Sequence, residues 1–283
     1  MWAIEAARKV KLDDFTAGRT FVQDFKKAHR ISSRRITKFV TLRTRADEPK
    51  IIAEAKKFVN EINEVKLITP YDDEHVWNTD QSGFNYEIVS RRTLSDNGEK
   101  KTFTLVQNMN ALTHSYTIQV LISNAGVLAP KLFICFQEKT GAFGPKVAEE
   151  FNLNTQPNMV RTSTTSDKMT KNALEYWIST CLEPRAFEKT LLLQDSWTGQ
   201  KDQELFNRKL TEPNNLEIKF IPPRTTKYAQ PLDVYFFRQY KLAVRCMQDA
   251  IRSTGKAEAE EKLRSRIFIM KMHSVVYNQL ISP

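Results

Sequence analysis

The chain has 283 residues, of which 41% are hydrophobic and 10% aromatic, so it can bury a large core and does not have a disordered composition. Its formal net charge is +10 and its pI is about 9.4, which favours a polyanionic partner, most often nucleic acid; the alternative is a merely basic soluble protein. Three scattered cysteines without a Cys-x-x-Cys pair argue against a disulfide framework or a zinc site and indicate a reducing compartment.

The sequence contains neither a membrane-spanning pattern nor a signal-peptide pattern. No apolar run reaches the roughly 18 residues that a membrane span needs. The N-terminus lacks the basic-then-apolar order of a secretory signal. We therefore expect a cytoplasmic or nuclear protein.

The first fifth of the chain supplies most of the excess positive charge. Residues 1–50 hold 13 Lys and Arg against 6 Asp and Glu, a net charge of +7. The apolar spacing predicts a helix over residues 13–28, and Ser32 or Ser33 can cap a second short helix. This order is the helix-turn-helix pattern, and the alternative is two amphipathic helices with an ordinary solvated basic face. The candidate DNA-binding residues are Lys26, Lys27, Arg34, Arg35 and Lys38.

A polar stretch separates this region from the rest of the chain. Residues 43–49 end in Pro49 and read as a linker, and residues 50–63 show the apolar stripe of a helix that packs on a core. We expect three parts: a helix-turn-helix region at 1–45, a linker and packing helix at 46–70, and a larger domain at 71–283.

The larger domain begins with strands and then alternates helix and strand. Gly83 is expected to end the first strand, and a glycine-containing hairpin connects the next two. This order predicts an α/β fold with a mixed sheet and helices on both faces. The expected strands are 75–80, 115–123, 131–138, 158–166, 189–197 and 215–223, and the expected helices are 144–152, 171–182, 231–252 and 257–280.

Three aspartates occupy positions where the sites of α/β sheets form. Asp80 and Asp195 come at the carboxyl ends of predicted strands, and Asp233 comes in the first turn of a helix. Three close carboxylates repel one another unless they share hard divalent cations such as Mg²⁺ or Mn²⁺. Two such ions can activate a water or sugar hydroxyl and stabilise the leaving oxygen of a phosphodiester. The alternative is that these aspartates are ordinary turn and cap residues.

Three sequence blocks around these aspartates resemble one family. The blocks "NTDQSG", "LLLQDSW" and "IPPRTTKYAQPLDVYFFRQYK" are similar to the DDE endonuclease domain of pogo-like transposases, within the mariner-type superfamily. The resemblance covers roughly residues 60–280. The segment "GRTFVQDFKKAHRISSRRITKF" resembles the end of the centromere-protein-B-type helix-turn-helix that precedes this domain in the family.

The resemblance implies a ribonuclease-H-like fold and a DNA endonuclease and strand transferase that acts in the nucleus. It implies that Asp80, Asp195 and Asp233 are the catalytic, metal-binding triad for Mg²⁺ or Mn²⁺. A homodimer on DNA follows by analogy. The flanking residues Asn78, Gln81, Ser196 and Gln230 are candidates for groups that support the metal ligands, or are satisfied polar residues of strand ends and turns.

The chain also departs from this family. It starts part-way into the usual DNA-binding region and stops where the family continues, which fits a truncated copy, a partial gene model or a domesticated descendant. The alternative function is therefore a transposase-derived DNA-binding protein without catalytic activity.

Overall fold

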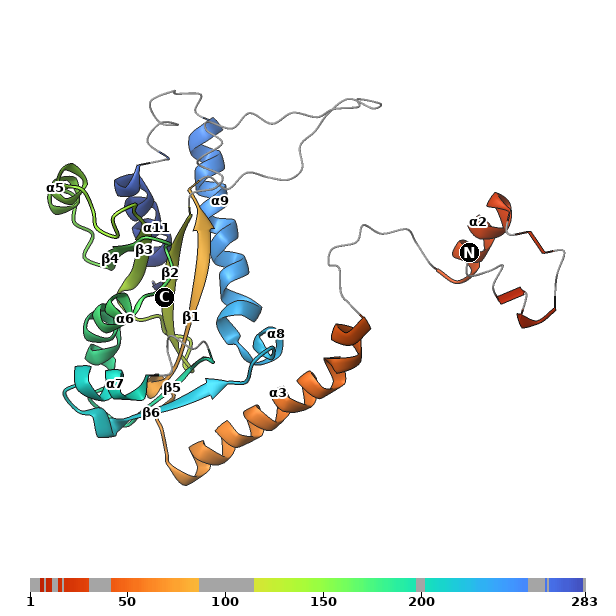
Figure 1. Cartoon of the computed structure of the whole chain (residues 1–283), viewed down its shortest axis with the longest axis horizontal. Coiled ribbons are helices and arrows are strands. Elements are labelled where there is room, and N and C mark those ends of the chain that lie inside the picture. Colours follow the sequence, from red (N-terminus) through yellow and green to blue (C-terminus); the bar gives the residue numbers. More distant parts are fainter. Residues whose placement is uncertain are drawn as a thin grey trace. The chain divides into compact units, whose positions relative to one another are not determined.

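The computed structural model describes most of the chain (Figure 1). Contacts divide the chain into two units, residues 1–48 and residues 49–283. The described residues are 6–7, 9–11, 15–16, 18–30, 42–86, 115–196, 202–253, 263 and 265–281, with only the backbone described for 42–46 and 253.

The described residues of the N-terminal unit include the helix α2 (Arg19–Ala28). It begins later than predicted, because Gly18 is extended and acts as the N-cap residue. The ring of Phe21 contacts Phe15 edge-on at 4.9 Å between centroids and lies 6.1 Å from Phe25. The predicted second helix, with its serine cap, lies outside the described residues.

Residues 43–49, predicted as a linker, are helical in the structure, and the division between the two units falls at their end, between Glu48 and Pro49. The helix α3 runs from Leu42 to Ile68 and contains Pro49 in its interior. A proline removes one backbone hydrogen bond of a helix at a cost of roughly 3 kcal/mol. Past Pro49 the helix buries an apolar side, on which Phe58 and Ile62 pack against strand residues, and this packing favours a continuous helix.

Six strands form one mixed sheet in the order β4-β3-β2-β1-β5-β6. The pairs β1–β2 and β2–β3 are antiparallel, whereas β3–β4, β1–β5 and β5–β6 are parallel. The expectation of a ribonuclease-H-like mixed sheet is confirmed by this arrangement. The strands are β1 (Val76–Asn85), β2 (Ser115–Ser123), β3 (Leu132–Gln137), β4 (Met159–Thr164), β5 (Thr190–Asp195) and β6 (Leu216–Ile221).

Helices cover both faces of the sheet, as the sequence predicted. Alternate residues of β2 point to opposite sides, so Ile118 packs in one apolar core and Leu121 in the other. The first core includes α9 and α11, and the second includes α6 and α7. Besides α3, the described helices of this unit are α5 (Pro145–Leu153), α6 (Lys171–Trp177), α7 (Gln203–Lys209), α8 (Thr226–Ala229), α9 (Phe237–Ser253) and α11 (Arg266–Ile281).

Shorter helical segments join these elements. Two of them are π-helices: η2 (Ile178–Leu182) continues α6, and η6 (Leu232–Phe236) leads into α9. The 3-10 turns η1 (Asp73–His75) and η3 (Glu183–Arg185) precede β1 and β5, and η5 (Pro213–Asn215) precedes β6. Among the described helices, none is long and apolar enough to cross a membrane.

The prediction that Gly83 ends the first strand is wrong. β1 continues to Asn85, because Gln81 to Asn85 keep antiparallel partners on β2, from Gln119 to Ser115. The pairing of β1 with its other neighbour, β5, is shorter and covers only Val76 to Thr79. The far half of β1 is therefore paired on one side by β2 and not by β5.

Candidate active site

Asp80 and Asp195 lie beside each other on adjacent strands. The last parallel pair of β1 and β5 is Thr79 with Gln194, and each aspartate directly follows its member of that pair. Adjacent strands are about 4.8 Å apart, and residues at matching register point to the same face of the sheet. The sheet thus brings together two carboxylates that are far apart in the sequence.

The sequence placed both aspartates at strand ends, and this is right for Asp195 and wrong for Asp80. Asp195 is the last residue of β5. Asp80 is in the middle of β1, where β5 stops pairing and β2 continues. It therefore occupies the end of the parallel part of the sheet, so the two side chains still share one edge.

The third aspartate is presented by the segment that follows β6. Asp233 lies in the first turn of η6, two residues after Pro231, as predicted. Its pKa is raised by partial burial of the carboxyl group, lowered by the positive charge of Lys241 and raised by Asp195. Asp233 is thus within electrostatic reach of the sheet-edge carboxylates.

The pKa of Asp80 is strongly raised. Burial and then the negative charge of Asp233 raise the pKa of Asp80 to about 7, and the charge of Asp195 adds a smaller rise. The backbone N–H of Gln81 and the side chain of Gln230 lower this pKa through hydrogen bonds. The carboxyl of Asp80 is therefore half protonated near neutral pH, as expected where like charges meet in a partly desolvated place.

Two buried amides join the elements that carry the aspartates. The side-chain nitrogen of Asn78 donates to the Leu193 carbonyl of β5 at 3.0 Å and to Oε1 of Gln230 at 3.3 Å. The nitrogen of Gln230 donates to the Thr79 carbonyl at 3.2 Å. Gln230 is fully buried and Asn78 is 5% exposed. These bonds connect β1, β5 and the turn before η6.

The other two flanking residues act through their backbone. The N–H of Gln81 donates to an oxygen of Asp80 at 2.7 Å, and the N–H of Ser196 donates to an oxygen of Asp195 at the same distance. Each bond orients one carboxylate and leaves its second oxygen for other partners. The sequence alone suggested these positions but not that their main chain makes the contact.

A buried histidine holds α9, the continuation of η6, against the sheet. His273 of α11 lies between two hydroxyls, with its Nε2 2.7 Å from Tyr116 and its Nδ1 2.8 Å from Tyr240. Burial lowers the pKa of His273 to about 3, so the ring is neutral and accepts one bond while it donates the other. This contact joins β2, α9 and α11.

Lys241 was missed in the sequence and belongs to the surroundings of the site. It lies two turns after Asp233, and its amino group lies 5.1 Å from the centroid of the Phe84 ring. Burial lowers the pKa of Lys241, and the charge of Asp233 opposes that shift. Residues eight positions apart in continuous helical segments fall on one stripe, and this spacing of Asp233 in η6 and Lys241 in α9 is the signal that could have identified Lys241.

The donor set fits a hard divalent cation. The three side chains offer only carboxylate oxygens, which suit Mg²⁺ and Mn²⁺. Burial first, and then the charges of Asp233 and Asp195, raise the pKa of Asp80, so a cation bound here would offset both effects. Among the described residues, no group of three or more His, Cys, Asp or Glu side chains is arranged closely enough to hold a metal ion as it stands.

The predicted DNA-binding residues are only partly described. Lys26 and Lys27 are exposed in the last turn of α2, which has no buried residues. Arg34, Arg35 and Lys38 lie outside the described residues. The structure therefore places two of the five candidates, both on a solvent-facing helix.

Comparisons with known proteins give one family match and several structural likenesses. Solved structures of Mos1 transposase are similar in fold: a paired-end complex with the left transposon end (TM-score 0.44, 12% identity, 96% of this chain and 77% of the other). The Mos1 mariner paired-end complex with Mn is similar as well, with a TM-score of 0.49 and 9% identity over 98% of this chain and 77% of the other. The complex with Mg has a TM-score of 0.46 and 9% identity over 99% of this chain and 77% of the other. No curated protein matches the sequence.

The family match is narrower than the resemblance seen in the sequence. Residues 140–272 match the sequence model described as DDE superfamily endonuclease. The matched segment includes Asp195 and Asp233, whereas Asp80 precedes it. The chain thus carries a DDE superfamily endonuclease match over the strand and the helix that present two of its three site aspartates.

Proposed function

We propose that this chain is a divalent-metal-dependent DNA endonuclease and strand transferase of a pogo-like transposon, and that it acts in the nucleus. The observation that carries the proposal is the position of Asp80 and Asp195 on adjacent strands, with Asp233 within electrostatic reach of both. The match of residues 140–272 to the DDE superfamily endonucleases supports the same activity.

The three carboxylates would hold two metal ions. Asp80 and Asp195 would bind them jointly, and Asp233 would complete the second position. When bound, the ions would supply activation of a water or sugar hydroxyl and stabilisation of the leaving oxygen. Asn78 and Gln230 would keep β1, β5 and η6 in register, so that the carboxylates stay aligned with a scissile phosphodiester.

The proposed reaction is attack at phosphorus. In cleavage a water oxygen forms a bond to phosphorus, the bond to the 3′ oxygen breaks, and that oxygen takes up a proton. In strand transfer the freed 3′ hydroxyl loses its proton and its oxygen forms a bond to a phosphorus of the target, while the bond from that phosphorus to the target's 3′ oxygen breaks and that oxygen takes up a proton. Asp80 would serve as a metal ligand in this reaction, so the proton of the attacking group would leave to solvent.

The basic N-terminal region would bind DNA. We propose that residues 1–45 form a partial centromere-protein-B-type helix-turn-helix, that residues 46–70 connect it, and that residues 71–283 form the endonuclease domain. Each phosphate contact would release counterions, with a slope of roughly −0.9 in log affinity against log salt. Two copies of the chain would bind one DNA as a homodimer.

Calorimetry with Mn²⁺ tests the metal site. The parent chain should bind Mn²⁺, and an Asp195→Asn variant should lose that binding, because the substitution removes one charge and keeps the shape. An Asp24→Asn variant is the matched control, since Asp24 is exposed on α2 and changes the net charge equally. Failure of the folded parent to bind Mn²⁺ would contradict the proposal.

A second candidate function is DNA binding without catalysis. It is favoured by the concentration of charge in residues 1–50, whose net charge is +7, and by exposed Lys26 and Lys27 on α2. In that case DNA affinity depends on these lysines, and the Asp195→Asn variant behaves as the parent does in every assay. Cleavage of DNA in Mn²⁺ by the parent, but not by the Asp195→Asn variant, would support the first function over the second.

A further inference from the structure

A pocket of about 280 Å³ lies at the opposite end of β5 from Asp195. Three separate segments build it: the turn η1 before β1, the hairpin between β2 and β3, and the segment from η3 to the start of β5. The six residues of β5 place it roughly 16–20 Å from the aspartates, at a rise of about 3.3 Å per residue. The pocket is therefore separate from the candidate active site.

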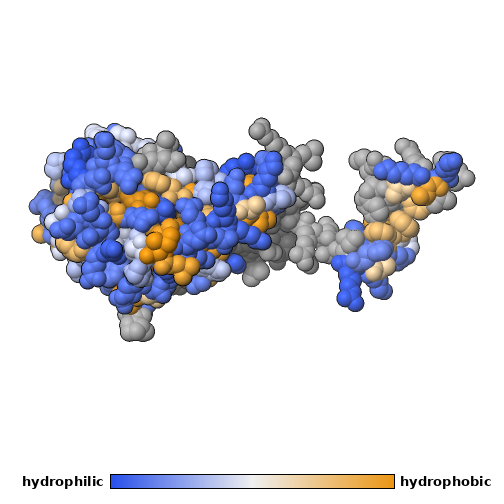
Figure 2. Space-filling model, turned by 90° about the horizontal axis from the view of Figure 1, so that it is seen from below, coloured by the Kyte–Doolittle hydropathy of each residue, from blue (hydrophilic) through white to orange (hydrophobic). Residues whose placement is uncertain are grey.

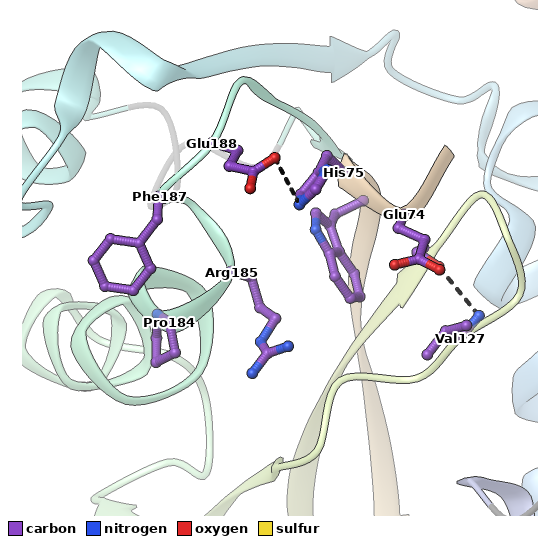
Figure 3. Close-up of a pocket in the computed structure, with 9 residues that line it drawn as sticks. Glu74, His75, Val127, Pro184, Arg185, Phe187 and Glu188 are labelled. Carbon is purple, nitrogen blue, oxygen red and sulfur yellow. Dashed lines mark hydrogen bonds and ion pairs between the residues drawn. The ribbon is translucent and has the colours of Figure 1, made fainter. Parts of the chain in front are cut away.

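The lining of the pocket combines apolar and polar side chains, and a cation reaches into it. Trp77 is 5% exposed and Phe187 is 55% exposed, so the pocket has a buried aromatic wall and an open aromatic rim. In Figure 3 the side chain of Arg185 lies between Pro184 and Phe187 on one side and Val127 on the other. A guanidinium between apolar surfaces is the arrangement that binds a carboxylate beside an apolar group.

Arg185 is available for such a ligand. In the part of the chain that the structure describes, its side chain has neither an ion pair nor a hydrogen bond. The indole N–H of Trp77 is buried and also lacks a partner among the described residues. A buried donor without an acceptor is unfavourable by about 1–3 kcal/mol. Two hydrogen-bond donors at one pocket are thus left without acceptors.

The negative charges at the rim restrict the ligand further. Glu74 and Glu188 both line the pocket, and Glu188 lies 3.8 Å from Nε2 of His75. A nucleic acid, with a charge on every phosphate, would be repelled by two carboxylates. A peptide offers one carboxylate for Arg185 and backbone N–H groups for the glutamates. The pocket is also smaller than most small-molecule sites, and its size suits one apolar side chain.

We propose that this pocket is a docking site for a partner protein, which inserts an apolar side chain next to a carboxylate. The apolar side chain packs on Trp77 and Phe187, and the carboxylate pairs with Arg185. Hydrophobic residues also reach the surface elsewhere (Figure 2), so exposure alone does not single out this place. The distinguishing feature is the guanidinium of Arg185, unpaired among the described residues, in a pocket that also has the aromatic side chains of Trp77 and Phe187. The proposal is independent of the function proposed for the aspartates.

Nuclear magnetic resonance of the Trp77 indole N–H tests the proposal in the full chain. The probe is a four-residue peptide, blocked at both ends, with phenylalanine followed by aspartate at its centre. Two matched peptides replace the aspartate by asparagine or the phenylalanine by alanine. A Trp77→Phe variant assigns the resonance. The aspartate peptide should shift it saturably and bind about tenfold more tightly than either matched peptide, because a charge-assisted pair and an apolar anchor are each lost.

Two variants of the pocket sharpen the test. Arg185→Met should abolish the preference for aspartate over asparagine, and Glu74→Gln should strengthen binding of the aspartate peptide, because it removes a repelling charge. The Asp195→Asn variant should bind the peptide as the parent does, which separates this pocket from the metal site.

Three results would overturn the proposal. The first is equal binding of the aspartate and asparagine peptides, or no shift at all with any peptide. The second is a shift of Trp77 by a single-stranded oligonucleotide that Arg185→Met removes, which would assign the pocket to nucleic acid. The third is a shift with protein concentration alone, which would assign it to a second copy of the chain.

Discussion

The side chain of Asn78 donates a hydrogen bond of 3.3 Å to Gln230, which lies 152 residues further along the chain. Gln230 returns a bond to the carbonyl of Thr79, the residue before Asp80. These two bonds fasten the strand that carries Asp80 to the turn that presents Asp233. The electrostatic coupling of the two aspartates therefore depends on a pair of neutral, buried amides.

The amide pair should be cooperative. Asn78→Ala and Gln230→Ala should each lower the free energy of unfolding by about 1–3 kcal/mol, because each leaves a buried polar group without its partner. The double variant should lose less than the two single losses combined, by roughly 0.5–1.5 kcal/mol, since the partners are in contact. Urea denaturation gives the free energy of unfolding of the parent, the two single variants and the double variant. Strict additivity would show that the two amides do not act together.

Replacement of Asp80 should stabilise the chain at neutral pH. The pKa of Asp80 is raised from 3.8 to about 7, so the folded chain holds a proton that the unfolded chain releases. Stability therefore falls as pH rises from about 4 to about 7, and this loss is complete above pH 7. An Asp80→Asn variant lacks the loss, so it should be more stable by about 2–4 kcal/mol above neutrality.

The check is thermal melting of the parent and the Asp80→Asn variant across this pH range, without metal. The difference in melting temperature should grow with pH and then level off. Asp24→Asn changes the same charge at an exposed position and should give a small, constant difference. A constant difference for Asp80→Asn as well would show that its carboxyl is not perturbed.

Affinity for Mn²⁺ should depend on pH in the same region. Asp80 must lose its proton to bind a cation, and its pKa is about 7. Below pH 7 the affinity should therefore fall about tenfold per pH unit, if one proton is displaced. Calorimetry in two buffers of different ionisation enthalpy also counts the released protons. Affinity that is level down to about pH 5 would contradict the assignment of Asp80 as a ligand.

The buried histidine should contribute to stability as a neutral ring. His273→Phe leaves the hydroxyls of Tyr116 and Tyr240 without partners and should cost about 2–4 kcal/mol. Lys271→Ala on the same helix breaks an exposed bond to Asn154 and should cost less than about 0.5 kcal/mol.

The pH dependence of the His273 contribution has the opposite sign to that of Asp80. The pKa of His273 is lowered from 6.5 to about 3, so the unfolded chain takes up a proton that the folded chain does not. The parent loses this contribution as pH falls below about 6.5, and the deficit of His273→Phe should shrink with it. A deficit that grows at low pH would indicate a charged ring in the folded chain.

Sequence patterns within a few residues predicted the positions of most helices and strands. The remaining ends depend on pairing or packing with residues far along the chain. The positions of Asp195 at the end of a strand and of Asp233 in the first turn of a helical segment were predicted correctly, because an apolar run and a proline mark the end of β5 and the start of η6. Asp80 was misplaced at a strand end, because the extension of β1 to Asn85 depends on its pairing with β2, some 40 residues away. Pro49 suggested a linker where core packing further along favours a helix.

The contacts between side chains could not be predicted from the sequence. Asn78 and Gln230 were named as candidates, but their mutual bond requires the register of β1 with β5 and the path of the chain after β6. The pocket around Arg185 is assembled from three segments that carry no shared motif. Such features arise from the topology and not from any local pattern.

The most direct test of the central claim is cleavage of supercoiled plasmid DNA by the purified chain in Mn²⁺ or Mg²⁺. We predict nicked and linear products with the parent and with Asp24→Asn, and none with Asp80→Asn, Asp195→Asn or Asp233→Asn, all of which should still bind DNA. Cleavage that persists unchanged in the Asp195→Asn variant, or a folded, DNA-bound parent that cuts in neither metal, would contradict the account.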